Sequence, residues 1–151
     1  MIYIGIDPGM SGGIAIIDDT GFLAATLVIK GSTEHDVADW LRDYSGSESL
    51  RPQAVIESVH SMPKQGVASS FKFGRSFGFL LGCLTCLKIP YTLATPQTWQ
   101  KAMKCMTKGD KNVTKAAAQR LYPDFLHVTH ANADAILLAR YCYETNRAAE
   151  N

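Results

Sequence analysis

Cysteines are few in this sequence, and long apolar runs are absent. The 151 residues include four cysteines, and no apolar stretch approaches the roughly 18–20 residues of a membrane-spanning helix. The first residues show no basic segment leading into an apolar one, as a secretion signal would. We therefore expect a protein that does not enter a membrane, stays in the cytosol and carries no disulfide framework.

The cysteines are Cys83, Cys86, Cys105 and Cys142, and the first two form a C-x-x-C pair. Such a pair can be half of a zinc site or a redox pair. No second pair of cysteines or histidines has the spacing of zinc ligands, and the pair lies within an apolar helical pattern. We interpret Cys83 and Cys86 as small buried core residues.

Acidic residues are scarce in the middle of the chain. The net charge is only +1, but residues 58–119 hold nine Lys and Arg against one acid, Asp110, while the rest holds thirteen acids against six bases. This stretch can place a positive face beside a nucleic-acid backbone, and a solvated basic surface fits the charge equally well. The length suits a single domain, residues 1–151, whose core is large enough to be stable without disulfide bonds.

The hydrophobic pattern predicts a mixed α/β protein. Alternating apolar residues and turn signals predict five strands, over 1–7, 14–18, 22–29, 54–57 and 89–94. Helical spacing and capping residues predict five helices, from a cap at 32 or 33 to about 44, and over 67–87, 96–103, 111–121 and 131–147. Three antiparallel strands followed by strand–helix units give a mixed five-stranded sheet with helices on both faces.

Gly74, Gly78 and Gly82 recur at every fourth position of the long helix predicted over 67–87. One flank of that helix therefore has little side chain, which permits close approach of a helix, a sheet or a nucleic-acid backbone. We expect close protein packing on this flank.

Three acids occupy unusual positions. Asp7 follows the first strand at a Pro-Gly turn, Glu57 ends an apolar strand, and Asp134 lies among alanines in the last helix. If the two strands are adjacent and parallel, their carboxyl ends place Asp7 and Glu57 side by side, and the last helix can add Asp134. Singly, each has an ordinary explanation as a turn residue, a lysine partner or a helix N-terminal acid. Their joint placement favours a metal site.

Converging carboxylates without compensating arginines repel one another and raise their own pKa values, and a hard divalent cation removes that penalty. Carboxylate oxygens suit Mg²⁺ or Mn²⁺. Two such ions ~3.5–4 Å apart can activate a water and stabilise the leaving oxygen in phosphodiester hydrolysis. His130, four residues before Asp134, shares its helical face and is the candidate fourth ligand, with Asn132 as the alternative. A structural hydrogen bond is the competing role for His130.

The ordered motifs resemble the RuvC family of Holliday-junction resolvases, in particular its short bacteriophage-type members. The matching segments span almost the whole chain: Gly5-Ile6-Asp7-Pro8-Gly9, Ile56-Glu57, Gln65 to Phe79, Pro96-Gln97-Thr98-Trp99 and Ala133 to Ala139. The first segment alone also resembles the phosphate loop of actin-like sugar kinases. Such a phosphotransferase would need a second, similar domain, which 151 residues do not supply.

The resemblance implies an RNase H-like fold and metal-dependent nicking of branched DNA (four-way junctions, forks or flaps), leaving a 5′-phosphate and a 3′-hydroxyl. It implies Asp7, Glu57 and Asp134 as catalytic metal ligands, and Lys111 is similar in place to a family lysine near the scissile phosphate. The family's fourth ligand stands commonly where this chain has Ala131, next to His130. A non-catalytic junction-binding module of the same fold is therefore the alternative function.

The resemblance also implies homodimers, action in the host cytoplasm if a phage encodes the protein, and DNA contacts in two basic segments. In the first, Phe71 and Phe73 would stack on unpaired bases and Lys72 and Arg75 would bind phosphates; helix core is the competing role for the two aromatics. The second segment supplies four lysines, for which a solvated surface charge is the competing role. They are Lys101, Lys104, Lys108 and Lys115.

Overall fold

The structure is a computed structural model that describes residues 1–45, 47, 49–58, 60 and 66–150. Its strands are β1 (Ile2–Ile6), β2 (Gly13–Asp18), β3 (Leu23–Val28), β4 (Pro52–Glu57) and β5 (Tyr91–Ala94). Its helices are α1 (Glu34–Ser45), α2 (Val67–Cys86), α3 (Pro96–Ala102), α4 (Lys111–Leu121) and α5 (Ala133–Glu150). Among the described residues, no helix combines the length and apolar character needed to cross a membrane.

The strands form one mixed sheet in the order β3-β2-β1-β4-β5. β1 pairs antiparallel with β2 and parallel with β4, and β4 pairs parallel with β5. β1 is therefore central, and all five of its residues are buried. The mixed five-stranded sheet predicted from the sequence is confirmed.

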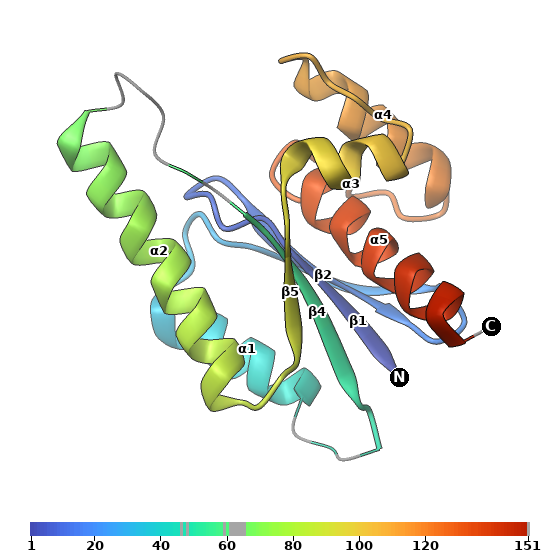
Figure 1. Ribbon diagram of the computed structural model, residues 1–151, viewed down its shortest axis with the longest axis horizontal. Coiled ribbons are helices and arrows are strands. Elements are labelled where there is room, and N and C mark those ends of the chain that lie inside the picture. The colour runs from blue at the N-terminus through green and yellow to red at the C-terminus, as the bar shows by residue number, and fades with distance from the viewer. Residues whose placement is uncertain (46, 48, 59, 61–65, 151) are drawn as a thin grey trace.

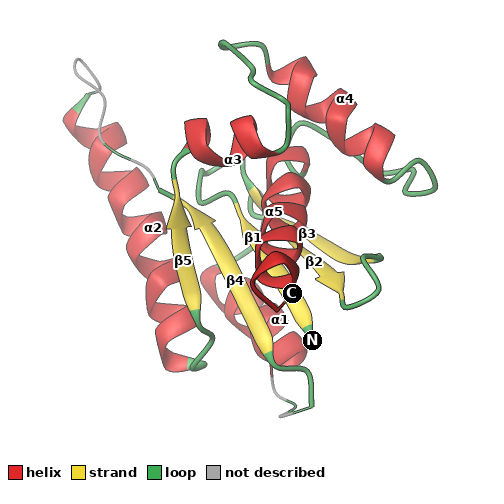
Figure 2. Cartoon of the chain, turned by 45° about the vertical axis from the view of Figure 1, so that its right-hand side comes forward, coloured by secondary structure: helices red, strands yellow, loops and turns green. Residues whose placement is uncertain are grey.

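Helices cover both faces of the sheet. Figures 1 and 2 show α1 and α2 on one face and α3, α4 and α5 on the other. On one face, isoleucines such as Ile4 of β1 and Ile16 of β2 pack with α1 and α2; on the opposite face, Tyr3 and Ile17 pack with α5. Each face thus buries its own apolar cluster, and the sheet separates the two.

Helix α5 crosses β1 at Gly5 with almost no space between the two backbones. A Cβ at Gly5 would collide with the carbonyl oxygen of Ala135 and the amide nitrogen of Ala139. Glycine is therefore required for this close approach. The crossing fixes the first turn of α5, which carries Asp134, beside the end of β1, after which Asp7 follows.

The prediction of close packing against the glycines of α2 is wrong for the chain by itself. Within the described part of the chain, a Cβ at Gly74, Gly78 or Gly82 would meet no atom within 4 Å. Helix α2 instead buries the opposite side, with Leu80 and Leu84 in the core. The glycines repeat at helical spacing, but that spacing does not say which side faces the sheet.

The cysteine interpretation is right in part. All four cysteines are free thiols; Cys105 and Cys142 are buried and Cys83 is half-buried, whereas Cys86 is exposed. The prediction of a buried Cys86 is wrong because this residue lies in the last turn of α2, on the solvent side. Most predicted boundaries also move by one to three residues; for example, β1 ends at Ile6, β4 begins at Pro52, and α5 begins at Ala133 rather than at residue 131.

Candidate active site

The carboxyl ends of β1 and β4 bring Asp7 and Glu57 together. The two strands are parallel neighbours, and their register pairs Ile6 with Ile56. Asp7 and Glu57 are the next residues, so they emerge side by side at the same edge of the sheet. This adjacency, predicted from two short apolar segments, is confirmed.

A tight loop holds Asp7 in place. Its side-chain Oδ1 accepts a hydrogen bond from the backbone N–H of Gly9 over 3.2 Å, and its own N–H donates to the carbonyl of Gly13 over 3.0 Å. A Cβ at Gly12 would collide with the backbone and carboxylate of Asp7. The loop therefore folds back over Asp7 only because residue 12 is glycine.

Glu57 is held by a buried tryptophan from another element. The indole Nε1 of Trp99 donates a hydrogen bond to Oε2 of Glu57 over 2.7 Å, and Trp99 is fully buried. Thr95 caps α3, with the Thr98 N–H donating to its hydroxyl over 3.2 Å, and so aims this helix across the end of β4. The sequence pattern placed Trp99 only in the Pro96-Gln97-Thr98-Trp99 segment; the signal for its role is that a buried indole N–H needs an acceptor.

Asp134 completes the group from the first turn of α5. It is half-buried, and the side chain of Thr114 on α4 lowers the pKa of its carboxylate, while the Thr114 hydroxyl donates to the Lys111 carbonyl over 3.3 Å. Thr114 is itself buried and was not singled out from the sequence, because its role depends on how α4 packs against α5. We call Asp7, Glu57 and Asp134 the acidic cluster.

Burial makes ionisation of the acidic cluster costly. It raises the pKa of Asp7 from 3.8 to about 6, and the negative charge of Asp134 adds to this while the Gly9 N–H and Lys111 oppose it. Burial likewise raises the pKa of Glu57 from 4.5 to about 7, the Trp99 hydrogen bond opposes this, and the charges of Asp7 and Asp134 add to it.

Burial also raises the pKa of Asp134, whereas Thr114 and the charges of Lys111 and His130 lower it. Because the members of the cluster act on one another's pKa values, they are electrostatic neighbours. None of the ion pairs found among the described residues neutralises them.

The two candidates for a fourth metal ligand, Asn132 and His130, differ in burial and in hydrogen bonding. Asn132 is buried: its Oδ1 accepts from the Thr129 N–H over 2.8 Å and its Nδ2 donates to the His127 carbonyl over 2.9 Å. Both ends of this amide are therefore engaged in shaping the turn before α5. His130 is exposed and close enough for its charge to act on Asp134. Within the described ranges, no group of three or more His, Cys, Asp or Glu side chains forms a ready-made metal site.

Comparison with known proteins gives structural matches without sequence matches. No protein-family model and no curated protein matches the chain. A Thermus thermophilus RuvC structure superposes with a TM-score of 0.67 at 18% identity, covering 98% of this chain and 97% of that one. A structure of T. thermophilus RuvC in complex with Holliday junction substrate gives 0.67 at 17% identity, covering 97% and 96%.

The chain has a RuvC-like fold. The expected RNase H-like α/β architecture is thereby confirmed over nearly the whole length. The bacteriophage-type assignment stays a prediction.

In this RuvC-like fold, Lys111 begins α4 next to the acidic cluster. Its side chain is exposed, and its positive charge lowers the pKa values of both Asp7 and Asp134. Asp110 caps the helix by accepting from the Asn112 N–H over 2.9 Å. The structure therefore brings Lys111 to the site, as the sequence predicted, through the cap that starts α4.

The other lysines predicted to contact DNA surround α3 and α4. Lys101 lies on α3, Lys104 and Lys108 follow it, and all three are exposed, whereas Lys115 on α4 is half-buried. Lys104 and Lys108 have positive φ values of 55° and 47°, so both occupy tight turns.

The residues of the first basic segment, with its two phenylalanines, differ in how far they are buried. Phe71 is 72% exposed, so a core role is wrong for it, whereas Phe73 is half-buried. Lys72 and Arg75 are exposed, and Arg75 donates to Glu34 of α1 over 2.9 Å. Gln65, at the start of the matching segment, lies outside the described residues.

Proposed function

We propose that this protein is a crossover-junction endodeoxyribonuclease, a metal-dependent enzyme that nicks branched DNA such as Holliday junctions. One observation carries the proposal. Three desolvated carboxylates with no ion-pair partner among the described residues gather where the parallel strands of a RuvC-like sheet end. Open α/β sheets place their sites at that edge.

The donor set fits a hard divalent cation. Asp7, Glu57 and Asp134 offer carboxylate oxygens in a setting that disfavours three uncompensated charges, which is the chemistry that Mg²⁺ or Mn²⁺ prefers. His130 is the remaining ligand candidate for a second ion, because Ala131 contributes no donor. When bound, such ions supply Lewis-acid activation of the phosphate and of the attacking water.

The protein's own groups then have separate tasks. Asp7, which the loop from Gly9 to Gly13 holds in place, would be the ligand shared by both ions. Trp99 keeps the Glu57 carboxylate in one orientation, and Thr114 favours the charged form of Asp134. Lys111 places a positive charge where the phosphodiester would gain negative charge during hydrolysis. The products would be a 5′-phosphate and a 3′-hydroxyl.

The basic side chains around the acidic cluster favour DNA as its substrate. Lys101, Lys104, Lys108 and Lys115 lie around α3 and α4 beside Lys111, and lysines of this kind bind phosphates without reading sequence. Phe71, exposed on α2, offers a face on which an unpaired base can stack, with Phe73, Lys72 and Arg75 near it. The T. thermophilus RuvC structure with a Holliday junction substrate supports branched DNA as the partner.

A homodimer formed through the outer side of α2 is part of this proposal. That side presents Gly74, Gly78 and Gly82 with open space above them, together with Val67, which is 89% exposed. Glycines at this spacing allow a second helix to approach closely. Gly78→Arg should convert a dimer to monomers in analytical ultracentrifugation, and Ala149→Arg, exposed on α5, is the comparison for added charge away from that side.

The test of catalysis is a cleavage panel over four-way junctions, forks, flaps and nicked duplex with Mg²⁺ and with Mn²⁺. The wild-type protein should nick branched substrates only with metal, and Asp7→Asn should abolish nicking while leaving binding intact. Asp39→Asn, on the exposed side of α1, controls for the lost charge. Unchanged cleavage by Asp7→Asn would refute the site assignment.

The second candidate is a non-catalytic junction-binding module of the same fold. Ala131 supports it, because the acidic cluster then lacks a fourth carboxylate. In that case the panel should show tight junction binding that is independent of metal, with no nicking under either ion.

A further inference from the structure

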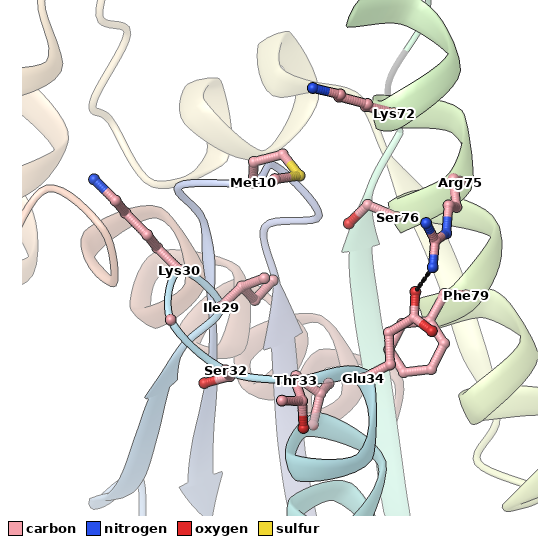
Figure 3. Close-up of a pocket in the computed structure, with 12 residues that line it drawn as sticks. Met10, Ile29, Lys30, Ser32, Thr33, Glu34, Lys72, Arg75, Ser76 and Phe79 are labelled. Carbon is pink, nitrogen blue, oxygen red and sulfur yellow. Dashed lines mark hydrogen bonds and ion pairs between the residues drawn. The ribbon is translucent and has the colours of Figure 1, made fainter.

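A pocket lies on the other side of the loop that holds Asp7. It has a volume of about 390 Å³ and opens between the loop after β1, the turn after β3 and helix α2 (Figure 3). The walls are tied together: the Ile29 N–H donates to the Gly12 carbonyl over 3.0 Å, and the Ser76 hydroxyl donates to the Pro8 carbonyl over 3.0 Å. The loop that orients Asp7 is thus also a wall of this pocket.

The pocket combines an apolar floor with a cationic rim. Ile29, Val37 and Phe79 form the floor, and Met10, which is 59% exposed, lies at the mouth. Figure 3 shows Lys72 extending from helix α2 toward Met10, and Lys30 on the opposite rim, in the turn after β3, extending outward. Neither lysine takes part in any ion pair found among the described residues.

One acid lines the pocket, and it is already engaged. Glu34 at the start of α1 accepts a hydrogen bond from the Arg75 guanidinium over 2.9 Å, and both side chains are more than half exposed. Three cations against one acid leave the lining with a net charge of +2. The carboxylate of Glu34 holds the guanidinium as a phosphate would, because both groups offer the same oxygen acceptors.

These features suit a nucleotide. A base is a flat apolar body that can stack on the floor, and its phosphate would meet the lysines at the rim. The volume falls within the roughly 300–1,000 Å³ of small-ligand pockets. A paired base cannot enter without leaving its stack, which costs a few kcal/mol in duplex DNA and least for a base that is already unpaired.

We propose that this pocket receives one unpaired nucleotide of the branched substrate, next to the phosphodiester cut at the acidic cluster. The base lies against Met10 and Phe79, and the phosphates on its two sides meet Lys72 on one rim and Lys30 on the other. The DNA competes with Glu34 for Arg75. This proposal rests on the proposed nuclease function and gives it a source of structure selectivity, because intact duplex offers no free base to the pocket.

The test is a binding comparison in EDTA, where no cleavage occurs. Two four-way junctions differ only at the exchange point, where one carries normal nucleotides and the other abasic ones. The wild-type protein should bind the abasic junction roughly tenfold more weakly, as expected when a stacked base is lost. In Met10→Ala this difference should shrink to about twofold, because the variant has lost the contact that senses the base.

Charge variants test the rim. Lys30→Gln should weaken binding of both junctions and reduce the salt dependence of binding by about one charge, whereas Lys88→Gln, at the far end of α2, should change neither. Glu34→Gln should tighten binding about threefold, and Arg75→Ala should remove that gain. Asp39→Asn removes the same charge elsewhere on α1 and should leave affinity unchanged.

The outcomes separate this proposal from the function on which it rests. If Met10→Ala and Lys30→Gln nick junctions in a metal- and Asp7-dependent way but keep the full abasic penalty, the pocket proposal is overturned and the nuclease stands. If the wild type shows the abasic penalty through Met10 but never nicks, the nuclease is overturned and the pocket stands as part of a binding module. Equal effects of Glu34→Gln and Asp39→Asn would refute the competition for Arg75.

Discussion

The indole nitrogen of Trp99 lies 2.7 Å from Oε2 of Glu57 and donates a hydrogen bond to it. The residues are 42 positions apart in the sequence and come from α3 and the end of β4. The bond opposes the effect of burial on the Glu57 pKa, so Trp99 both orients this carboxylate and favours its charged form. We regard Trp99 as a positioning residue for the acidic cluster.

Trp99→Phe should therefore impair catalysis more than stability. The variant keeps most of the buried ring but removes the donor, so the Glu57 pKa should rise and metal affinity should fall by roughly 10–100-fold. The measurement is nicking rate against Mg²⁺ concentration at several pH values. Trp40→Phe is the matched control, because Trp40 packs against Tyr44 on α1, on the opposite face of the sheet. If the nicking rates of the two variants depend on Mg²⁺ concentration and pH in the same way, Trp99 is not a positioning residue for the acidic cluster.

The metal-free protein should lose stability as the pH rises from about 4 to about 7. The folded-state pKa values of Asp7 and Glu57, about 6 and about 7, lie above their unfolded values of 3.8 and 4.5. In this window the folded protein holds more protons than the unfolded chain, so the free energy of unfolding falls with increasing pH. For Asp7 the loss is at most on the order of 3 kcal/mol, since one pKa unit corresponds to about 1.36 kcal/mol.

Asp7→Asn should thus raise the melting temperature at pH 8 in EDTA and flatten its dependence on pH. Added Mg²⁺ should stabilise the wild type and have much less effect on this variant. Thermal melts from pH 5 to pH 8, with Asp39→Asn as the control for an exposed acid, check both points. A wild-type melting temperature that rises across this range would contradict the assigned pKa directions.

His130 and Asn132 should separate into a functional and a structural residue. His130→Ala should lower metal-dependent nicking at least about tenfold with little change in stability, as expected for a ligand on an exposed turn. Asn132→Ala should cost about 1–3 kcal/mol, because the Thr129 N–H and the His127 carbonyl lose their partner. Urea unfolding beside nicking rates distinguishes the two, and the opposite pattern would make Asn132 the better ligand candidate.

Two glycines should respond in opposite ways to the same change. Gly5→Ala puts a Cβ into the backbone of α5 and should cost more than about 3 kcal/mol, enough to prevent folding or displace the helix. Gly74→Ala meets no described atom of the chain itself, so in the monomeric Gly78→Arg background it should stabilise α2 by up to about 1 kcal/mol. Circular dichroism melts of both variants test this. A stable Gly5→Ala protein would show that α5 does not cross β1 as closely as described.

The sequence by itself determined the order of strands and helices and the edge at which the site forms. Alternating apolar residues, Pro-Gly turns and capping residues act over a few neighbours, so they can be read locally. Asp7 and Glu57 were placed together because two parallel strands that lie side by side end at the same edge. Lys111 was implied by the resemblance to the RuvC family, and the cap at Asp110 predicted only where its helix begins.

Only the tertiary structure decided which partners these residues meet. Trp99 and Thr114 serve the acidic cluster because α3 and α4 pack across the sheet edge, and no local pattern specifies that distance. The glycine flank of α2 faces outward because Leu80 and Leu84 compete better for burial. The pocket beside Asp7 joins residues from three separate elements. Contacts between distant segments depend on how whole faces pack, and a spacing along one segment does not carry that information.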